Sequence, residues 1–208
     1  MTDNYIGRLV VISAPSGGGK TSLIKELIAK NKRLVKSISY TTRQMRPGEV
    51  TGVNYNFVSD SEFKELLDRN LFLEHAKVYD HRYGTSKLWV ENQLAKGVDV
   101  ILDLDWQGAR SIKHIFPKCV NVYLLPPSIK ELKARLENRG QDSQEIIQKR
   151  IKMAKDDISH YNEFDYVIVN DSFDKAIHDM QAILDSLRLK NDIQKIKQAK
   201  LLQQLLAE

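Results

Sequence analysis

The sequence predicts an α/β fold in which a parallel β-sheet core is wrapped by helices. Short apolar runs rich in β-branched residues alternate with segments of helical period, which is the pattern of a parallel sheet with crossover helices. The first apolar run leads directly into a glycine-rich loop and a helical segment. The chain has 208 residues, 42% of them hydrophobic, which is enough to bury a core without disulfides or structural metal.

Four short apolar runs, each bounded by turn-forming residues, are predicted as strands. Such runs are typical of parallel strands that are buried on both faces. They cover residues 8–13, 98–104, 120–125 and 166–169.

Helices are expected where apolar residues recur at helical spacing. Two Ser-x-x-Glu pairs, Ser59 with Glu62 and Ser128 with Glu131, have the spacing of a capping box and predict helix starts. Further helical patterns cover residues 87–96, 128–138, 143–158 and 173–189, and we expect residues 190–205 to form one last helix.

The alternation of strands and helices breaks between residues 37 and 83. Polar segments that contain tyrosine, SISYTTR and GVNYNFV, are predicted as short strands of a different sheet. We therefore expect an inserted lobe in this part of the chain.

Charge and composition argue against several classes of protein. The net charge is +5, but residues 188–208 contribute five cations and two acids, so the body is nearly neutral and lacks the basic face of a nucleic-acid binder. No apolar run approaches the ~20 residues that cross a bilayer. The N-terminus lacks a basic start and a cleavage site, and a single cysteine, Cys119, fits a reducing compartment. We expect a cytoplasmic protein that binds neither nucleic acid nor membrane.

The strongest chemical signal is the segment APSGGGKT, residues 14–21, which lies between the first strand and a helix. It matches a P-loop except that Ala14 stands at the first glycine position. Small residues allow backbone N–H groups to surround phosphate oxygens, Lys20 would reach the outer phosphates, and the Thr21 hydroxyl would bind Mg²⁺. The alternative is a glycine-rich hairpin beside a surface lysine.

An acid follows the apolar run of residues 100–102, where a P-loop protein often carries a carboxylate. Asp103 and Asp105 are two residues apart and would share a face of an extended strand. Either could be an ordinary strand-end acid. The segment DWQG at 105–108 also spells the DxxG of GTPases, but the sequence has no base-reading Asn-Lys-x-Asp segment.

Several further motifs give the sequence a resemblance to the guanylate kinase family. They run in family order from about residue 8 to residue 188: SAPSGGGK, TTRxxRPGE, GxxYxF, FLE, YGT, DLDxQG, LxxRG and VND. This resemblance implies Mg²⁺-dependent transfer of the γ-phosphoryl group of ATP to GMP, and to dGMP, which gives ADP and GDP.

The resemblance implies a donor site around the P-loop. The ATP-binding residues would be Ala14, Pro15, Ser16, Gly17, Gly18, Gly19, Lys20, Thr21, Ser22, Arg135, Asn170 and Asp171. Thr21 would bind the metal directly and Asp103 through water.

The GMP site would lie in the inserted lobe. Arg43 and Arg46, with Tyr55 and Tyr83, would grip the acceptor phosphate, because guanidinium groups match phosphate oxygens. Glu74 would accept from the adjacent N–H donors of guanine. By resemblance, the base pocket is completed by Ser39, Gly84, Thr85 and Asp105. Without the family pattern, the arginines would be interpreted as surface residues and Glu74 as an exposed acid.

The resemblance also implies a helical lid that closes over the donor phosphates. Arg135, Arg139 and Arg150 would neutralise charge there, although arginines on a helix usually face solvent. The expected catalytic residues are Lys20, Arg43, Arg139 and Arg150. We divide the chain into a P-loop core (1–36, 86–134 and 160–189), a GMP-binding lobe (37–85), a lid (135–159) and a basic tail (190–208).

Two alternatives to this function remain open. One is a kinase for another nucleoside monophosphate, and the other is a guanylate kinase-like interaction module without turnover. Such modules tend to lose the phosphate loop or the lid arginines, whereas this chain keeps both. The sequence leaves open whether the protein is a monomer or a homo-oligomer, and whether the tail docks or is solvated.

Overall fold

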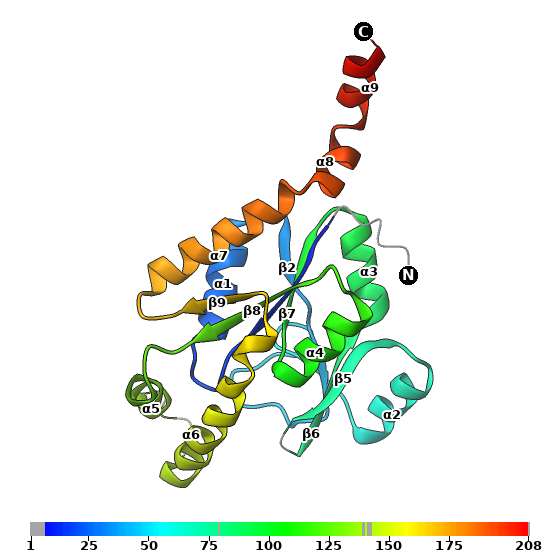
Figure 1. Cartoon of the computed structure of the whole chain (residues 1–208). Helices are drawn as coiled ribbons and strands as arrows, with labels where there is room; N and C mark the ends of the chain where they lie inside the picture. The colour runs from blue at the N-terminus through cyan, green and yellow to red at the C-terminus, as the bar shows by residue number, and fades with distance from the viewer. Residues whose placement is uncertain (1–6, 79, 139, 141–142, 208) are drawn as a thin grey trace.

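Within the residues that the structure describes, the central sheet is parallel and has five strands (Figure 1). The computed structural model describes residues 7–78, 80–138, 140 and 143–207. The strand order is β2-β7-β1-β8-β9, with β1 at Leu9–Ser13, β2 at Leu34–Lys36, β7 at Asp99–Asp103, β8 at Val120–Leu125 and β9 at Tyr166–Val169. The predicted α/β class is confirmed.

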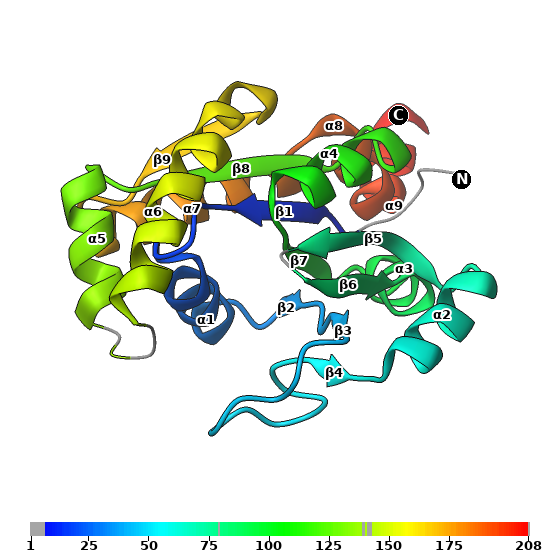
Figure 2. The ribbon, with the colours of Figure 1, turned by 90° about the horizontal axis from the view of Figure 1, so that it is seen from below.

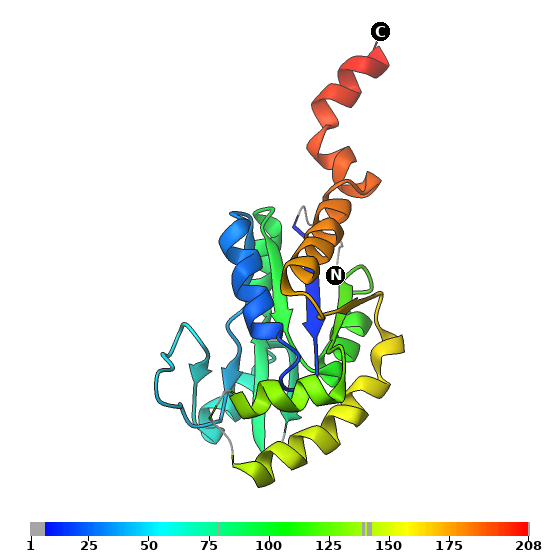
Figure 3. The ribbon, with the colours of Figure 1, turned by 90° about the vertical axis from the view of Figure 1, so that its left-hand side faces the viewer.

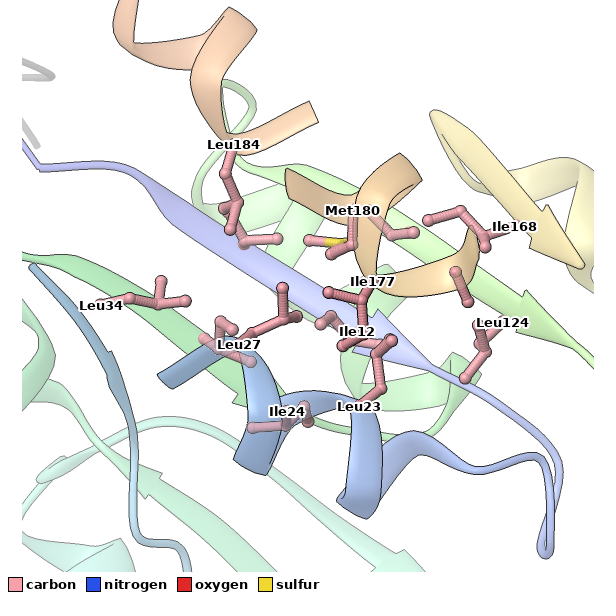
Figure 4. Packing of buried hydrophobic residues seen from close by; sticks show 14 of the residues in the cluster. Ile12, Leu23, Ile24, Leu27, Leu34, Leu124, Ile168, Ile177, Met180 and Leu184 are labelled. Atoms are coloured by element: carbon pink, nitrogen blue, oxygen red, sulfur yellow. The ribbon is translucent and has the colours of Figure 1, made fainter. Parts of the chain in front are cut away.

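Helices cover both faces of this sheet. On one face, α1 (Lys20–Lys30) and α7 (Phe173–Arg188) pack together over β1 and β8, and Figure 4 shows Leu27 of α1 and Met180 of α7 in the same cluster as Ile12. On the other face, α3 (Lys87–Ala95) and α4 (Trp106–Ile115) form a second apolar cluster with β1 and β7. Burial on both faces fixes β1 in the centre of the molecule, so the loop that follows it has a rigid base.

The expected second sheet is present within the inserted segment. Its order is β4-β3-β6-β5, with β3 at Tyr40–Thr41, β4 at Asn56–Phe57, β5 at Phe72–Val78 and β6 at His81–Ser86. Helix α2 (Asp60–Asp68) follows β4 and starts with the predicted capping box, since the Ser59 side chain accepts from Glu62 N–H and the Glu62 side chain accepts from Ser59 N–H.

Helices α5 (Ile129–Asn138) and α6 (Gln144–Ser159), followed by the short 3-10 helix η1 (Tyr161–Glu163), form the segment expected as a lid. The predicted start of α5 is confirmed in that the Ser128 hydroxyl accepts from Glu131 N–H. Figure 2 shows α5 and α6 on one side of α1 and the second sheet on the other. The domain limits drawn from the sequence stay a prediction.

The C-terminal segment differs from the single helix that we expected. It forms two helices, α8 (Asn191–Lys197) and α9 (Ala199–Ala207), with Gln198 between them in a non-helical conformation. Helix α8 is anchored by buried Ile193 and by an ion pair of Asp192 with Arg8, 2.6 Å long. Helix α9 buries no residue and extends away from the body (Figure 3).

Two elements of the core were missed and one was wrongly described. Strand β2 and helix α4 were not predicted. Strand β9 was expected to be buried on both faces, but it lies at the edge of the sheet and only Ile168 of its residues is buried. Across the described ranges, we find no helix with the length and apolar character needed to cross a bilayer.

Candidate active site

The loop after β1 has the backbone shape that a phosphate-binding loop requires. Gly17 and Gly19 adopt left-handed φ values of +88° and +96°, which side chains disfavour, and Gly18 N–H donates to the Pro15 carbonyl oxygen at 2.9 Å. Helix α1 begins at Lys20, so the N–H groups of its first turn point back towards this loop. Ala14 packs against the apolar cluster under α1 and α7, which shows how its methyl group is accommodated at the first position.

Asn170 holds this loop by a direct hydrogen bond, and Arg135 in turn holds Asn170. The buried Asn170 side chain donates from Nδ2 to the Gly18 carbonyl oxygen at 2.9 Å, and Arg135 Nη2 donates to the Asn170 carbonyl oxygen at 3.0 Å. A Cβ atom at Gly19 would collide with Asn170 Nδ2, so the glycine is required for this close approach. Asp171 is exposed, and its carboxylate accepts from Ser172 N–H.

Asp103 ends β7, and its carboxylate lies between two lysines. Lys20 Nζ is 2.8 Å from Oδ1, and Lys36 Nζ is 3.0 Å from Oδ2. Lys20 also donates to the Leu104 carbonyl oxygen at 2.8 Å. Burial raises the pKa of Asp103, but the two lysines outweigh it and lower the pKa to about 2. Asp103 is therefore ionised at neutral pH.

One cavity joins the P-loop side of the molecule to the inserted lobe. It has a volume of about 610 Å³. The core contributes Thr21 and Asp103, the lobe contributes Arg43, Arg46, Tyr55 and Tyr83, and α6 contributes Arg150. The structure thus brings residues predicted for both nucleotide sites to the walls of a single cleft.

Arg43 is held in this cleft by a neighbouring acid. Its Nη2 lies 2.7 and 3.0 Å from the two carboxylate oxygens of Glu49, and the guanidinium is 5.4 Å from the centre of the Tyr55 ring. Burial lowers the pKa of Arg43, but Glu49 raises that pKa above its usual value, so Arg43 stays positively charged. Arg46 N–H donates to Glu49 Oε2, while the Arg46 side chain is exposed on the cavity wall.

Tyr55 lies in the same part of the cavity. Burial raises the pKa of Tyr55, so its hydroxyl stays protonated and can donate to an anion. Tyr83 packs edge-on against Tyr55 with ring centres 5.9 Å apart.

Glu74 lies in β5 with its carboxylate inside the protein. It is only 5% exposed, and Thr85 Oγ1 donates to its Oε1 at 2.6 Å. Burial and the nearby charge of Asp105 raise the pKa of Glu74 to about 7, although the Thr85 hydrogen bond opposes this. An exposed surface acid would have neither this burial nor this pKa, so the structure argues against that alternative.

Three residues of the predicted base pocket lie near Glu74, namely Gly84, Thr85 and Asp105. Thr85 and Gly84 are both buried in β6, where the Gly84 Cα lies against the ring of Phe72. Asp105 follows β7 and caps α4, because its Oδ1 accepts from Gly108 N–H at 2.9 Å. Ser39 is half-buried between β2 and β3.

Helix α6 makes a direct contact with the phosphate loop. Arg150 Nη1 donates to the Ser16 hydroxyl at 3.2 Å. Ser22, in the first turn of α1, is exposed. Arg139, predicted as a lid residue, lies outside the described residues.

Comparison with known proteins decides the family. The guanylate kinase family model matches residues 6–187. The chain belongs to the guanylate kinase family. The predicted resemblance is therefore confirmed, and with it the assignment to the kinases, a class of transferases.

Bacterial guanylate kinases resemble the chain over nearly its whole length. The protein from Photobacterium profundum is 53% identical over 97% of this chain and 98% of its own. The guanylate kinase from Legionella pneumophila is 48% identical over 100% of this chain and 99% of its own. The crystal structure of guanylate kinase from Anaplasma phagocytophilum superposes with a TM-score of 0.77 at 33% identity, covering 91% of this chain and 90% of that one.

Sequence reasoning did not find every residue of this guanylate kinase cleft. Lys36, Asn54, His81 and Lys149 also line it, and Glu49 positions Arg43. Glu49 could have been found, since it lies in the TTRxxRPGE motif three residues after Arg46. Lys36 carried no signal, because it belongs to the short β2 strand that the pattern did not reveal.

Proposed function

We propose that this guanylate kinase family member transfers the γ-phosphoryl group of Mg²⁺-ATP to GMP, and to dGMP, and releases ADP and GDP. The single observation that carries the proposal is the shared cavity, where Thr21 and Asp103 of the core face Arg43 and Arg46 of the inserted lobe. One cleft with Thr21, which directly follows the glycine loop and Lys20, on one wall and two guanidinium groups on the other suits two nucleotides that meet phosphate to phosphate.

The reaction needs cations and a dry cleft more than it needs a base. The second phosphate pKa of a monophosphate is about 6, so the attacking oxygen is already ionised at neutral pH. That oxygen forms a bond to the γ-phosphorus while the bond from phosphorus to the β,γ-bridging oxygen breaks. Lys20, Arg43, Arg139 and Arg150 are proposed to neutralise the charge of the two polyanions, with Arg46, Tyr55 and Tyr83 holding the acceptor phosphate.

The residues near the loop fit a bound magnesium ion. Mg²⁺ prefers oxygen ligands and keeps several waters. The Thr21 hydroxyl and the ionised Asp103 carboxylate are oxygen donors on the same cavity wall. Thr21 would bind the ion directly and Asp103 through water, and the bound ion would neutralise donor phosphate oxygens.

The donor nucleotide is assigned to the segment 14–22 with Arg135, Asn170 and Asp171. Support comes from the left-handed glycines and from the Asn170 contact with Gly18. Besides the amide hydrogen donated to Gly18, the Asn170 side chain has a second amide hydrogen and its Oδ1, and either of these is proposed to contact a donor base.

Guanine selection is assigned to the buried carboxylate of Glu74. Guanine presents N1–H and N2–H₂ side by side, whereas adenine presents an acceptor at N1. A buried carboxylate that accepts from both guanine donors would be left unpaired by adenine, which costs binding energy. Ser39, Gly84, Thr85 and Asp105 would complete the pocket around the base.

A coupled assay of purified protein with ATP and each of GMP, dGMP, AMP, CMP and UMP tests the proposal. We expect turnover with GMP and dGMP and rates at least ~100-fold lower with the other three. A preference for another base would refute the guanine pocket. No turnover with any of them, together with intact GMP binding, would support the interaction-module alternative.

The cytoplasm is proposed as the place of action. The chain's single cysteine, Cys119, is buried and has no second cysteine to pair with.

A further inference from the structure

Lys36 is a positively charged residue that lines the cleft, and the proposed reaction assigns it no role. It is the last residue of β2, whose pairing with β7 places Lys36 opposite Ile101. From there its Nζ reaches Asp103 Oδ2 at 3.0 Å, and the side chain lines the shared cavity. Because β2 is part of the central sheet, Lys36 starts from a fixed position.

Asp103 forms ion pairs with both Lys36 and Lys20. Each lysine contacts a different carboxylate oxygen, with Lys20 Nζ 2.8 Å from Oδ1. The side chains are only 13% exposed for Asp103, 19% for Lys20 and 28% for Lys36. Water therefore screens these three charges less than it screens surface pairs.

Lys20 has to leave Asp103 if it is to bind the donor phosphates. In this structure its ammonium group is committed to Asp103 and to the Leu104 carbonyl oxygen. With no metal present, exchange of Lys20 from Asp103 to a phosphate leaves Asp103 with one cation if Lys36 is present, and with none if Lys36 is absent. An unpaired, poorly exposed carboxylate is costly, so the partner that stays behind determines how easily Lys20 is released.

We propose that Lys36 is a positioning residue that keeps Asp103 neutralised and oriented while Lys20 moves to the donor nucleotide. This inference rests on the proposed role of Lys20 at the donor phosphates. Lys36 acts through Asp103 and Lys20, and it does not itself touch the reacting groups.

Two other roles for Lys36 have to be separated from this one. Its Nζ is 6.0 Å from the centre of the Tyr55 ring, so it could attract the acceptor phosphate. It could also serve only as an ion pair that fastens β2 to β7. The first role predicts weaker GMP binding, and the second predicts lower stability with unchanged nucleotide binding.

Calorimetric titration with ADP, with EDTA present to remove metal, distinguishes these roles. In Lys36→Met we expect ADP affinity to fall about tenfold and GMP affinity to change less than ~twofold, because Asp103 then retains Lys20. Lys36→Arg should restore ADP affinity to within ~threefold of the native value. Lys30→Met, which removes the same charge from an exposed helix end, is the matched control and should bind ADP as the native protein does.

Asp103→Asn tests whether Lys36 acts through Asp103. This variant should bind metal-free ADP at least as tightly as the native protein, because Lys20 is released, and adding Lys36→Met should change ADP affinity less than ~twofold.

Three results would overturn the inference: unchanged ADP affinity in Lys36→Met, a loss confined to GMP, or a full loss of ADP affinity that persists in the Asp103→Asn background. Native protein that fails to bind ADP or to phosphorylate GMP would instead refute the proposed function.

Discussion

Glu74 is a carboxyl group whose charge state depends on pH near neutrality. Burial raises its pKa to about 7, whereas the contact that we propose with guanine requires the ionised form. GMP affinity should therefore rise as pH increases from 6 to 8. Glu74→Gln should weaken GMP binding about 100-fold at pH 8, leave ATP binding unchanged and remove this part of the pH dependence. Calorimetry with both nucleotides at the two pH values measures this, and equal losses for GMP and ATP would show that Glu74 is structural.

The same residue makes stability depend on pH. Because the folded pKa is raised, the stabilising effect of protonated Glu74 is complete below the unfolded value of 4.5 and is lost as pH rises through about 7. As pH rises from 5 to 8, the thermal midpoint of the native protein should therefore fall relative to that of Glu74→Gln. A constant difference between the two midpoints would contradict the raised pKa.

Lys20 is expected to act on the donor alone. Lys20→Met should lower kcat at least ~100-fold, because a cation at the transferring phosphate is lost. GMP affinity should stay within ~twofold, since Arg43, Arg46 and Glu74 are untouched. Stopped-assay rates and GMP calorimetry on the same preparation check this, and a collapse of GMP affinity would place Lys20 on the acceptor side.

At the scale of single residues, the sequence was informative where a motif dictates backbone shape. The glycines of the phosphate loop are required by left-handed φ and by the approach of Asn170, so their pattern predicts their place. Glu74 became a candidate only through the family resemblance, because nothing local distinguishes it from a surface acid. Its burial depends on the tertiary packing of β5, which pairs with β6 and also contacts α4 from a later part of the chain.

At the scale of elements, the capping signals correctly predicted the starts of α2 and α5, whereas the short strand β2 was not predicted. Helix α4 begins after the N-cap residue Asp105, but the sequence analysis considered Asp105 only as a nucleotide-binding residue and not as a cap. The helix sequence WQGARSIKHI also includes Gly108, which weakens the helical pattern. Strand β2 has three residues, too few to show alternation. The prediction that β9 is buried on both faces was wrong because local sequence does not determine strand order, and the strand order places β9 at the edge of the sheet.

The capping box of α2 provides a test of this local reasoning. Ser59→Ala should lower the free energy of unfolding by about 1 kcal/mol, because Glu62 N–H loses its acceptor, while kcat stays unchanged. Ser59→Asp should retain most of the stability, since aspartate is also a good N-cap. Denaturant titration of the three proteins measures the difference, and equal stability of the Ala and Asp variants would refute a role for the cap.

At the scale of the whole molecule, the proposed function requires two lobes that are built from distant parts of the chain. The phosphate loop follows β1, Arg43 lies in the loop after β3, Glu74 lies in β5, and Arg150 comes from α6. Figure 2 shows that the two lobes flank α1, which carries Lys20 and Thr21. The sequence resemblance predicted these parts, whereas the meeting of Thr21, Arg43 and Arg150 in one cavity is a property of the fold.

The central claim is that donor and acceptor bind at the same time and face each other in this cavity. Steady-state inhibition by adenosine and guanosine joined 5′ to 5′ through five phosphates tests it most directly. We expect inhibition that is competitive against both ATP and GMP, with affinity at least ~100-fold tighter than that of ADP or GMP alone. Inhibition competitive against only one nucleotide, with affinity no better than that nucleotide's own, would contradict it.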